Sequence, residues 1–235
     1  YKPKSLKTDY NFSKLIGKLN NLNPPEKLML PKVLSFNNYG WTEYIDHKEC
    51  KNLKDFNSYY RKAGSWLGIL HLYSATDFHA ENIIAYKNFP VPIDFETIMQ
   101  PSFLNTKRKI FSKSFIDANL FIDDSVTSLR MLPNFSLFKD NKKVYDNSGL
   151  KGGNSSYQTK IWKNVNKDNM YLKKILFADP PNKNLPFLKS KTGKFNNYVD
   201  EFINGFKNYL NFIIRLREKF GNNLFLKDFK KVDTR

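Results

Sequence analysis

A helix-like pattern leads directly into a polar loop and a two-stranded pattern between residues 56 and 94. From residue 56 to residue 73, apolar and aromatic side chains recur three and four positions apart, which is the spacing of a buried helix. Two short apolar runs follow, residues 83–86 and 91–94, and residues 87–90 between them predict a turn. This order favours a fold in which a buried helix ends beside a hairpin, with polar side chains gathered at one end of that hairpin.

The loop and the hairpin carry three oxygen-bearing side chains in a fixed order. Asp77 and Asn82 are separated by four residues, and Asp94, the last residue of the second predicted strand, begins an Asp-Phe-Glu run. Protein kinases space a catalytic Asp and a Mg²⁺-binding Asn as D-x-x-x-x-N, and a later D-F-G supplies a second metal-binding Asp. Each residue alone has an ordinary explanation as a cap or turn residue. Together they predict phosphoryl transfer, with Asp77 as base and with Asn82 and Asp94 as ligands of a nucleotide-bound Mg²⁺.

Phosphoryl transfer also needs a cation beside the phosphates. Lys2, at the end of a probable first strand, is the favoured candidate, and Lys4 is its rival because strand alternation points both side chains the same way. His79 stands between Asp77 and Asn82, where it could orient a phosphate or pair with a carboxylate. Glu96 replaces the Gly of the kinase motif and could add negative charge near the metal.

The other elements follow from periodicity. Residues 9–22 predict a helix, residues 32–36 and 41–45 predict a hairpin around an Asn-rich turn, and residues 199–220 predict a long helix closed by Gly221 in a left-handed conformation. Residues 102–186 are weakly patterned. Within them, the Gly-rich residues 147–154 lack the Walker A spacing and predict a mobile connection.

These elements predict an α+β, bilobal fold of the protein- and lipid-kinase type. Residues 1–50 would form an incomplete β-rich N-lobe and hinge, and residues 51–235 a larger, mainly helical C-lobe that holds the catalytic loop. Because the chain lacks an initiating Met and begins within a probable strand, we expect it to be a segment of a longer protein.

Composition limits which cellular compartment and which kinds of partner we expect for this chain. The chain has 235 residues, 16% aromatic, which is enough for a sizeable core. A single Cys50 and three His exclude a disulfide framework and a Cys/His zinc cluster. No signal peptide and no apolar run of about 20 residues is present. We therefore expect a cytoplasmic protein without a transmembrane segment. The formal charge of +17 comes from scattered Lys without a recognition module, so nucleic acid is not an expected partner, whereas an acidic polypeptide is.

Residues 59–85 and 92–97 closely resemble the dehydratase domain of class II lanthipeptide synthetases, the LanM family. The loop Thr76-Asp77-x-His79-x-Glu81-Asn82 is much more specific to that family than a generic kinase motif. Residues 1–6, 39–43 and 200–206 and the neighbourhood of Trp162 resemble the same domain, so the resemblance spans nearly the whole chain.

The resemblance implies an enzyme that uses ATP and Mg²⁺ to phosphorylate Ser and Thr in the core of a ribosomal precursor peptide, which also carries a leader. The phosphate is then eliminated to leave dehydroalanine or dehydrobutyrine. It implies these roles: ATP-phosphate binding by Lys2, activation of the substrate hydroxyl by Asp77, assistance by His79, Mg²⁺ ligation by Asn82 and Asp94, support by Glu96, and elimination by Arg235. Lys4 stands where the family usually has Arg. Zinc is expected only in a cyclase domain that would follow in the full-length parent.

Two other functions stay open from the sequence. One is a kinase-like phosphotransferase that does not eliminate the phosphate. The other is a degenerate, kinase-shaped module that only binds peptide.

Overall fold

A computed structural model of the chain describes residues 1–99, 112–133, 135–138, 143–146, 148–151, 156–178, 183–230 and 232. The helices are α1 (Lys7–Asn20), α2 (Lys54–Leu72), α3 (Lys113–Asp123), α4 (Val199–Phe220) and α5 (Asn223–Leu226), with 3₁₀ turns η1 (Ala80–Asn82), η2 (Val126–Leu129), η3 (Phe195–Asn197) and η4 (Lys227–Phe229). The strands are β1 (Val33–Ser35), β2 (Gly40–Thr42), β3 (Ile83–Tyr86), β4 (Phe89–Pro92), β5 (Phe135–Phe138), β6 (Lys143–Asp146), β7 (Ser156–Lys163), β8 (Tyr171–Ala178), β9 (Phe187–Leu188) and β10 (Lys191–Thr192). Among the described residues, no helix combines the length and the apolar character needed to cross a membrane.

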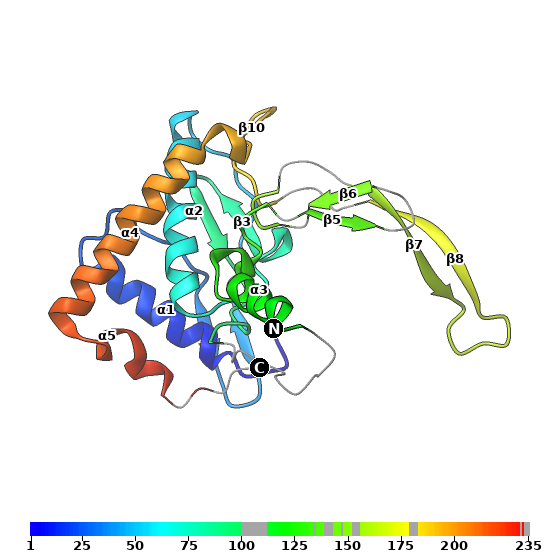
Figure 1. Ribbon diagram of the computed structural model, residues 1–235, viewed down its shortest axis with the longest axis horizontal. Helices are drawn as coiled ribbons and strands as arrows, with labels where there is room; N and C mark the ends of the chain where they lie inside the picture. The colour runs from blue at the N-terminus through cyan, green and yellow to red at the C-terminus, as the bar shows by residue number, and fades with distance from the viewer. Residues whose placement is uncertain are drawn as a thin grey trace.

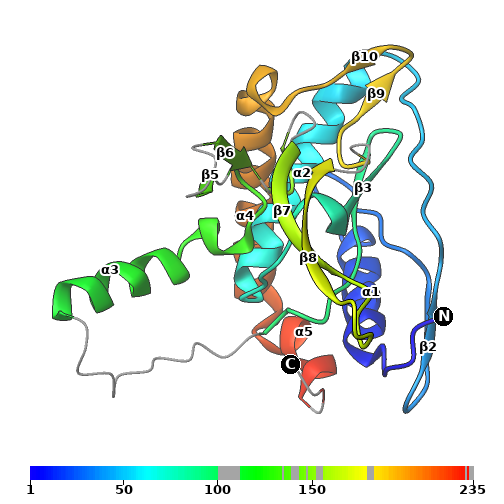
Figure 2. The same cartoon turned by 90° about the vertical axis from the view of Figure 1, so that its right-hand side faces the viewer.

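The core lies between α1, α2 and α4, with the β3–β4 hairpin packed on α2 (Figures 1 and 2). The apolar faces predicted for the first helix and for α2 are buried. At the centre, the ring of Phe12 lies 4.8 Å from that of Phe95 and 5.4 Å from that of Tyr73, measured between centroids. This cluster ties α1 and the end of α2 to the residue that follows Asp94, so the core directly supports the predicted site.

Helices α2 and α4 approach each other closely at two glycines. A Cβ added to Gly64 would lie 1.9 Å from the carbonyl oxygen of Phe202, and one added to Gly205 would lie 1.9 Å from that of Arg61. At the start of α4 the ring of Tyr198 stacks on that of Tyr60, with the ring centroids 5.0 Å apart and the planes nearly parallel. Only residues without a side chain allow the two backbones to come this near.

The β-rich beginning of the chain forms as predicted, with shorter strands. Strand β1 pairs with β2 in an antiparallel hairpin, and Lys2 extends the pairing because its N–H donates to the carbonyl oxygen of Gly40 at 2.9 Å and the reverse bond measures 3.0 Å. The predicted hairpin is therefore confirmed. Its pairing with residue 2 positions the Lys2 side chain.

The second predicted hairpin is also present, but its turn is shorter than predicted. Strand β4 begins at Phe89 and ends at Pro92, so two residues, Lys87 and Asn88, connect it to β3. Lys87 adopts a φ of 55°, a turn conformation that the sequence did not signal by Gly or Asn at that position. As a result Asp94 lies beyond the strand and is not its last residue.

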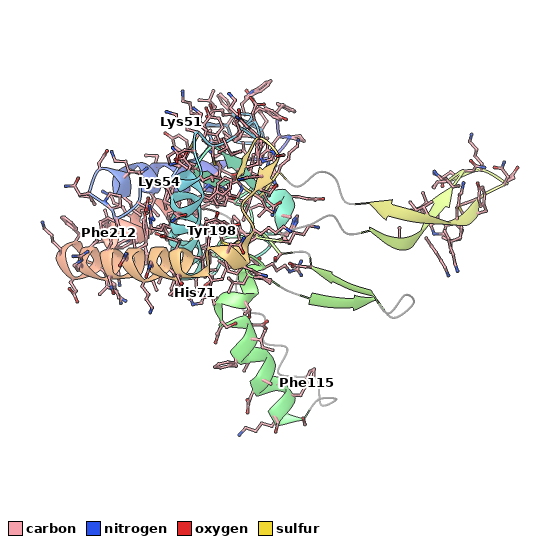
Figure 3. All side chains as sticks on the ribbon, turned by 90° about the horizontal axis from the view of Figure 1, so that it is seen from above. Lys51, Lys54, His71, Phe115, Tyr198 and Phe212 are labelled. Carbon is pink, nitrogen blue, oxygen red and sulfur yellow. The ribbon has the colours of Figure 1, made fainter. Side chains whose placement is uncertain are left out.

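Two further hairpins and α3 project from the body of the molecule (Figures 1 and 3). Strands β5 and β6 form one hairpin, and the eight-residue strands β7 and β8 form a longer one, within the region that the sequence left without elements. Phe115 on α3 and Trp162 on β7 are exposed. Where burial is described in β7 and β8, from residue 159 to 163 and from 171 to 175, neither face is buried, so these strands carry no strong periodic signal.

Two predicted details are corrected. Ser148 and Leu150 are buried, so residues 148–151 are packed and do not form a mobile connection, while residues 147 and 152–154 lie outside the described residues. Gly221 ends α4 with a positive φ of 67° as predicted, but its ψ of −176° is extended and not left-handed helical. The bilobal kinase-type arrangement and the division at residue 50 stay predictions.

Candidate functional site

A short ladder of hydrogen bonds holds the loop after α2 against the segment after β4. The N–H of Thr76 donates to the carbonyl oxygen of Thr97 at 3.1 Å, and the N–H of Ile93 donates to that of Asn82 at 2.9 Å. Within the loop, the Asn82 side chain donates from Nδ2 to the carbonyl oxygen of Asp77 at 2.8 Å. The structure therefore brings together the two segments that carry the predicted triplet.

Both aspartates of the triplet have positive φ, 66° at Asp77 and 64° at Asp94. Such values are uncommon outside Gly, and Asp and Asn tolerate them best among the other residues. Strained backbone of this kind concentrates at functional sites. Asp77 and Asp94 are two of ten non-Gly residues with positive φ in the described part of the chain.

Asp94 lies at the centre of a cluster of four charges. Its Oδ1 is 3.0 Å from Nζ of Lys2 and 3.4 Å from Nζ of Lys4, and Lys4 also forms an ion pair with Glu96. Both rival lysines therefore reach the same carboxylate, as predicted, although residue 4 lies in a bend and not in a strand. The structure does not choose between them.

The charges in this cluster shift each other's protonation. Burial alone would raise the pKa of the Asp94 carboxyl, but the hydrogen bond and charge of Lys2, together with Lys4, outweigh burial and hold that pKa below its ordinary value. Burial alone would lower the pKa of the Lys4 ammonium, and Glu96 and Asp94 raise it above its ordinary value. Because the pKa of Asp94 is depressed on folding, its contribution to stability is present above about pH 3.9 and is lost as the pH falls through the folded pKa.

Asp77 belongs to a second cluster, with His79 and Arg130. Its Oδ1 is 3.8 Å from Nε2 of His79 and 3.3 Å from Nη1 of Arg130. His79 caps η1, because its Nδ1 accepts the backbone N–H of Glu81 at 3.2 Å. In the neutral ring the proton is then assigned to Nε2, the nitrogen nearer the Asp77 carboxylate. The sequence did not single out Arg130, because it lies 53 residues from Asp77 and no local pattern marks it.

Asp9 is a second site residue that the sequence missed. It is 7% exposed on α1, and its Oδ1 accepts the N–H of Phe95 at 3.3 Å, next to Asp94. Burial raises the pKa of the Asp9 carboxyl, against the opposing effects of the Phe95 hydrogen bond and the charge of Lys2. The available signal was its place on the helix, since Asp9 shares the apolar face with Phe12 and Ile16.

A cavity of about 300 Å³ opens beside the first cluster. Lys2, Asp9 and Asp94 line it together with apolar residues in and next to the β1–β2 and β3–β4 hairpins: Leu30, Pro31, Val33, Ile45, Ile84 and Ile93. A mostly apolar pocket with a few charged groups is typical of small-molecule sites. This one suits a ligand with an apolar part and a charged part.

The possible Mg²⁺ ligands and Arg235 complete the set of predicted site residues. Among the described residues, no three His, Cys, Asp or Glu side chains gather as a metal site, so Asn82 and Asp94 could hold Mg²⁺ only with oxygen atoms supplied by a ligand and water. The amide nitrogen of Asn82 is engaged by Asp77, which leaves its Oδ1 as the ligand atom. Arg235 lies outside the described residues.

Replacing Asp9 by Asn is expected to change how stability depends on pH. Because folding raises the pKa of Asp9, the folded state binds a proton more tightly, and the free energy of unfolding falls as the pH rises from about 3.9 through the folded pKa. Asn keeps an oxygen for the Phe95 N–H and removes the buried charge. Thermal unfolding followed from about pH 3 to about pH 7 should show the variant gaining on the wild type as the pH rises.

The exposed Asp117 on α3 provides the control, since Asp117→Asn should show no such gain. An Asp9→Asn profile parallel to that of the wild type would contradict the raised pKa.

Comparisons with known proteins identify the family. The whole chain, residues 1–235, matches a family described as a domain of unknown function (DUF4135). The chain belongs to this family. The DUF4135 domain described here is also similar to the lacticin 481/lactococcin biosynthesis protein LcnDR2 of Lactococcus lactis subsp. lactis, with 29% identity over 231 residues that cover 93% of this chain. Both findings confirm the resemblance to LanM-type lanthipeptide synthetases. The chain spans about a quarter of the length of LcnDR2.

Proposed function

We propose that this DUF4135 domain is the dehydratase part of a lanthipeptide synthetase, a Ser/Thr phosphotransferase and lyase that acts on a ribosomal precursor peptide. Similarity to a lantibiotic biosynthesis protein supports a role in lanthipeptide modification. The observation that carries the finer proposal is the hydrogen-bond ladder, which holds Asp77, Asn82 and Asp94 together beside a cavity lined by Lys2. The bilobal kinase-type fold is part of the same proposal.

In this proposal the cavity takes the nucleotide. The apolar wall suits a purine ring, and the charged end suits the phosphates. Lys2 would contact the phosphates, and Asp94 and Oδ1 of Asn82 would hold Mg²⁺, whose charge would offset the charge of the transferred phosphoryl group. The two ammonium groups that now pair with Asp94 therefore stand where Mg²⁺ would bind.

Asp77 acts on the peptide. Its carboxylate, 42% exposed and next to the ladder, accepts the proton of the attacking Ser or Thr hydroxyl as the γ-phosphoryl group is transferred to the oxygen. Elimination then removes the Cα proton, forms the Cα–Cβ double bond and releases inorganic phosphate as the Cβ–O bond breaks. In this proposal His79 and Glu96 assist both steps, and Arg235 takes part in elimination.

The test is a mass measurement on the precursor peptide. The full-length protein is incubated with ATP, Mg²⁺ and a precursor peptide, and the peptide is weighed over time. Loss of water from Ser or Thr supports the dehydratase. A peptide that retains the phosphate would indicate a kinase without elimination. A peptide that binds but is not modified would indicate a peptide-binding module.

Replacing Lys2 by Gln is expected to lower the rate of phosphorylation about 10²-fold or more, because the nucleotide phosphates lose a preorganised cation. Phosphate incorporation into the peptide, measured over a range of ATP concentrations, gives the effect on kcat and on KM. Lys4→Gln is measured in parallel, because both lysines contact Asp94. The cation role of Lys2 requires the larger loss in the Lys2 variant.

The exposed Lys51 provides the control (Figure 3), and Lys51→Gln should match the wild type. A Lys2 variant that phosphorylates as fast as the Lys51 variant would refute the assignment of Lys2.

A further inference from the structure

Arg130 is fixed in place by its neighbours on both sides. Leu129 and Met131 are fully buried. The carbonyl oxygen of Leu129 accepts the N–H of Phe78 at 2.9 Å, and that of Arg130 accepts the N–H of Gly149 at 2.8 Å. The backbone of residue 130 is therefore held between the Asp77 loop and residues 148–151, which fixes the point from which its side chain extends.

The backbone at this position does not favour arginine. Arg130 has a φ of 59° and a ψ of 16°, the left-handed conformation that follows η2. Glycine adopts this conformation without steric cost, whereas a residue with a Cβ, such as arginine, adopts it at a cost. A residue kept in a disfavoured conformation at a candidate site suggests that its side chain has a task.

The guanidinium of Arg130 has the reach and the donors to bind an anion at Asp77. Its side chain is 52% exposed, and Nη1 lies 3.3 Å from Oδ1 of Asp77. A guanidinium offers five N–H donors in a planar fork, which can bind a phosphate through two parallel hydrogen bonds. Within the described part of the chain, the guanidinium makes this one contact with one carboxylate oxygen, which leaves donors for a ligand that approaches Asp77 from solvent.

The position of Arg130 indicates which phosphate it meets. Lys2 and Lys4 already stand at Asp94, where the nucleotide phosphates are proposed to lie. Arg130 stands instead at Asp77, where the acceptor hydroxyl is proposed to lie. After transfer, the new phosphate is on the peptide at that side of the site and close to Asp77. Once Asp77 has passed on the proton that it accepted, a cation between its carboxylate and the phosphate reduces their repulsion.

We propose that Arg130 binds the phosphate of the newly phosphorylated Ser or Thr and so keeps the phosphopeptide in the site. The inference rests on the proposed function and adds a binding site for a phosphate monoester. It assigns to this arginine a task separate from transfer itself, since retention of the intermediate decides whether the phosphate is eliminated or the phosphopeptide is released.

A binding experiment without ATP tests the site directly. Synthetic precursor peptides with one phosphoserine or with the matching serine are titrated into the full-length protein, and the ratio of their dissociation constants is measured. The wild type is expected to prefer the phosphopeptide at least about tenfold, which corresponds to one charge-assisted pair. Arg130→Gly should lose most of this preference, and Arg130→Lys should keep part of it, because Lys retains the charge without the fork.

The product ratio gives a second readout. With ATP, Mg²⁺ and peptide, the ratio of phosphorylated to dehydrated product should rise at least about tenfold in Arg130→Gly, because the intermediate escapes. Arg215→Ala, an exposed position on α4, should leave the ratio unchanged. The melting temperature of Arg130→Gly should not fall, since Gly fits the left-handed backbone.

An equal phosphopeptide preference in the wild type and in Arg130→Gly would overturn the inference. So would an absent preference in the wild type, even if dehydration proceeds normally. If the wild type prefers the phosphopeptide and the variant does not, but no peptide is ever phosphorylated, the binding site stands and the proposed function fails.

Discussion

Replacing Asp77 by Asn is expected to lower the rate of precursor phosphorylation by about 10²- to 10⁴-fold, the range for loss of a general base. Asn retains the shape of the side chain and cannot accept the hydroxyl proton. It also tolerates the φ of 66° found at this position, so the loop should keep its conformation. Alanine would be a poorer test, because it would add backbone strain to the loss of the base.

The measurement separates chemistry from binding. Phosphate incorporation is followed in a single turnover, and peptide affinity is measured separately by titration. Affinity should change little, because the hydrogen bond that Asn82 donates to residue 77 uses the backbone carbonyl and survives the substitution. Asp117→Asn on α3, exposed and outside the site, serves as the matched control. Normal turnover by the Asp77 variant would remove the residue from the mechanism.

Replacing Gly205 by Ala is expected to cost about 3 kcal/mol of stability, toward the upper end for overpacked cores. The added Cβ would lie 1.9 Å from the carbonyl oxygen of Arg61 and 2.7 Å from its Cα. These are backbone atoms of a helix, so no side chain can rotate away and α2 and α4 must separate. Because α2 leads into the Asp77 loop, activity should fall together with stability.

Gly17→Ala is the matched control. Gly17 lies inside α1, and nothing stands within 4 Å of the position its Cβ would take. Alanine there should stabilise the domain by about 0.5–1 kcal/mol through helix propensity. Hydrogen exchange of the amides of α2 and α4 in the full-length protein measures the local stability of these helices in both variants. Protection that is unchanged in Gly205→Ala would show that the two helices are not in close contact at this position.

Periodicity predicted the buried helices because their burial is one-sided and regular. The predicted bounds of α4, residues 199–220, agree with the structure, and Phe202, Tyr209, Ile213 and Leu216 are buried there. The last residue of the predicted stripe, Phe220, is 44% exposed because the helix extends past the core. For α1 the bounds differ by two residues at each end.

The same reasoning failed where elements bury neither face. Strands β7 and β8 pair over eight residues each, yet Trp162 and Leu172, which face each other across them, are 57% and 45% exposed. Apolar alternation reports a strand only when one face is buried and the other is not. A hairpin that projects from the body gives no such contrast, so the central region looked unpatterned.

For the candidate site, the sequence by itself determined the local part: the order and spacing of Asp77, Asn82 and Asp94, and the hairpin that brings the last two together. Only the tertiary structure decided which other charges join them. Asp9 reaches the segment after β4 across 86 residues and Arg130 reaches Asp77 across 53. The physical reason is that spacing along a chain encodes contacts within one loop or hairpin, whereas these two residues are brought in by the packing of α1 and η2 against the core, which no local pattern records.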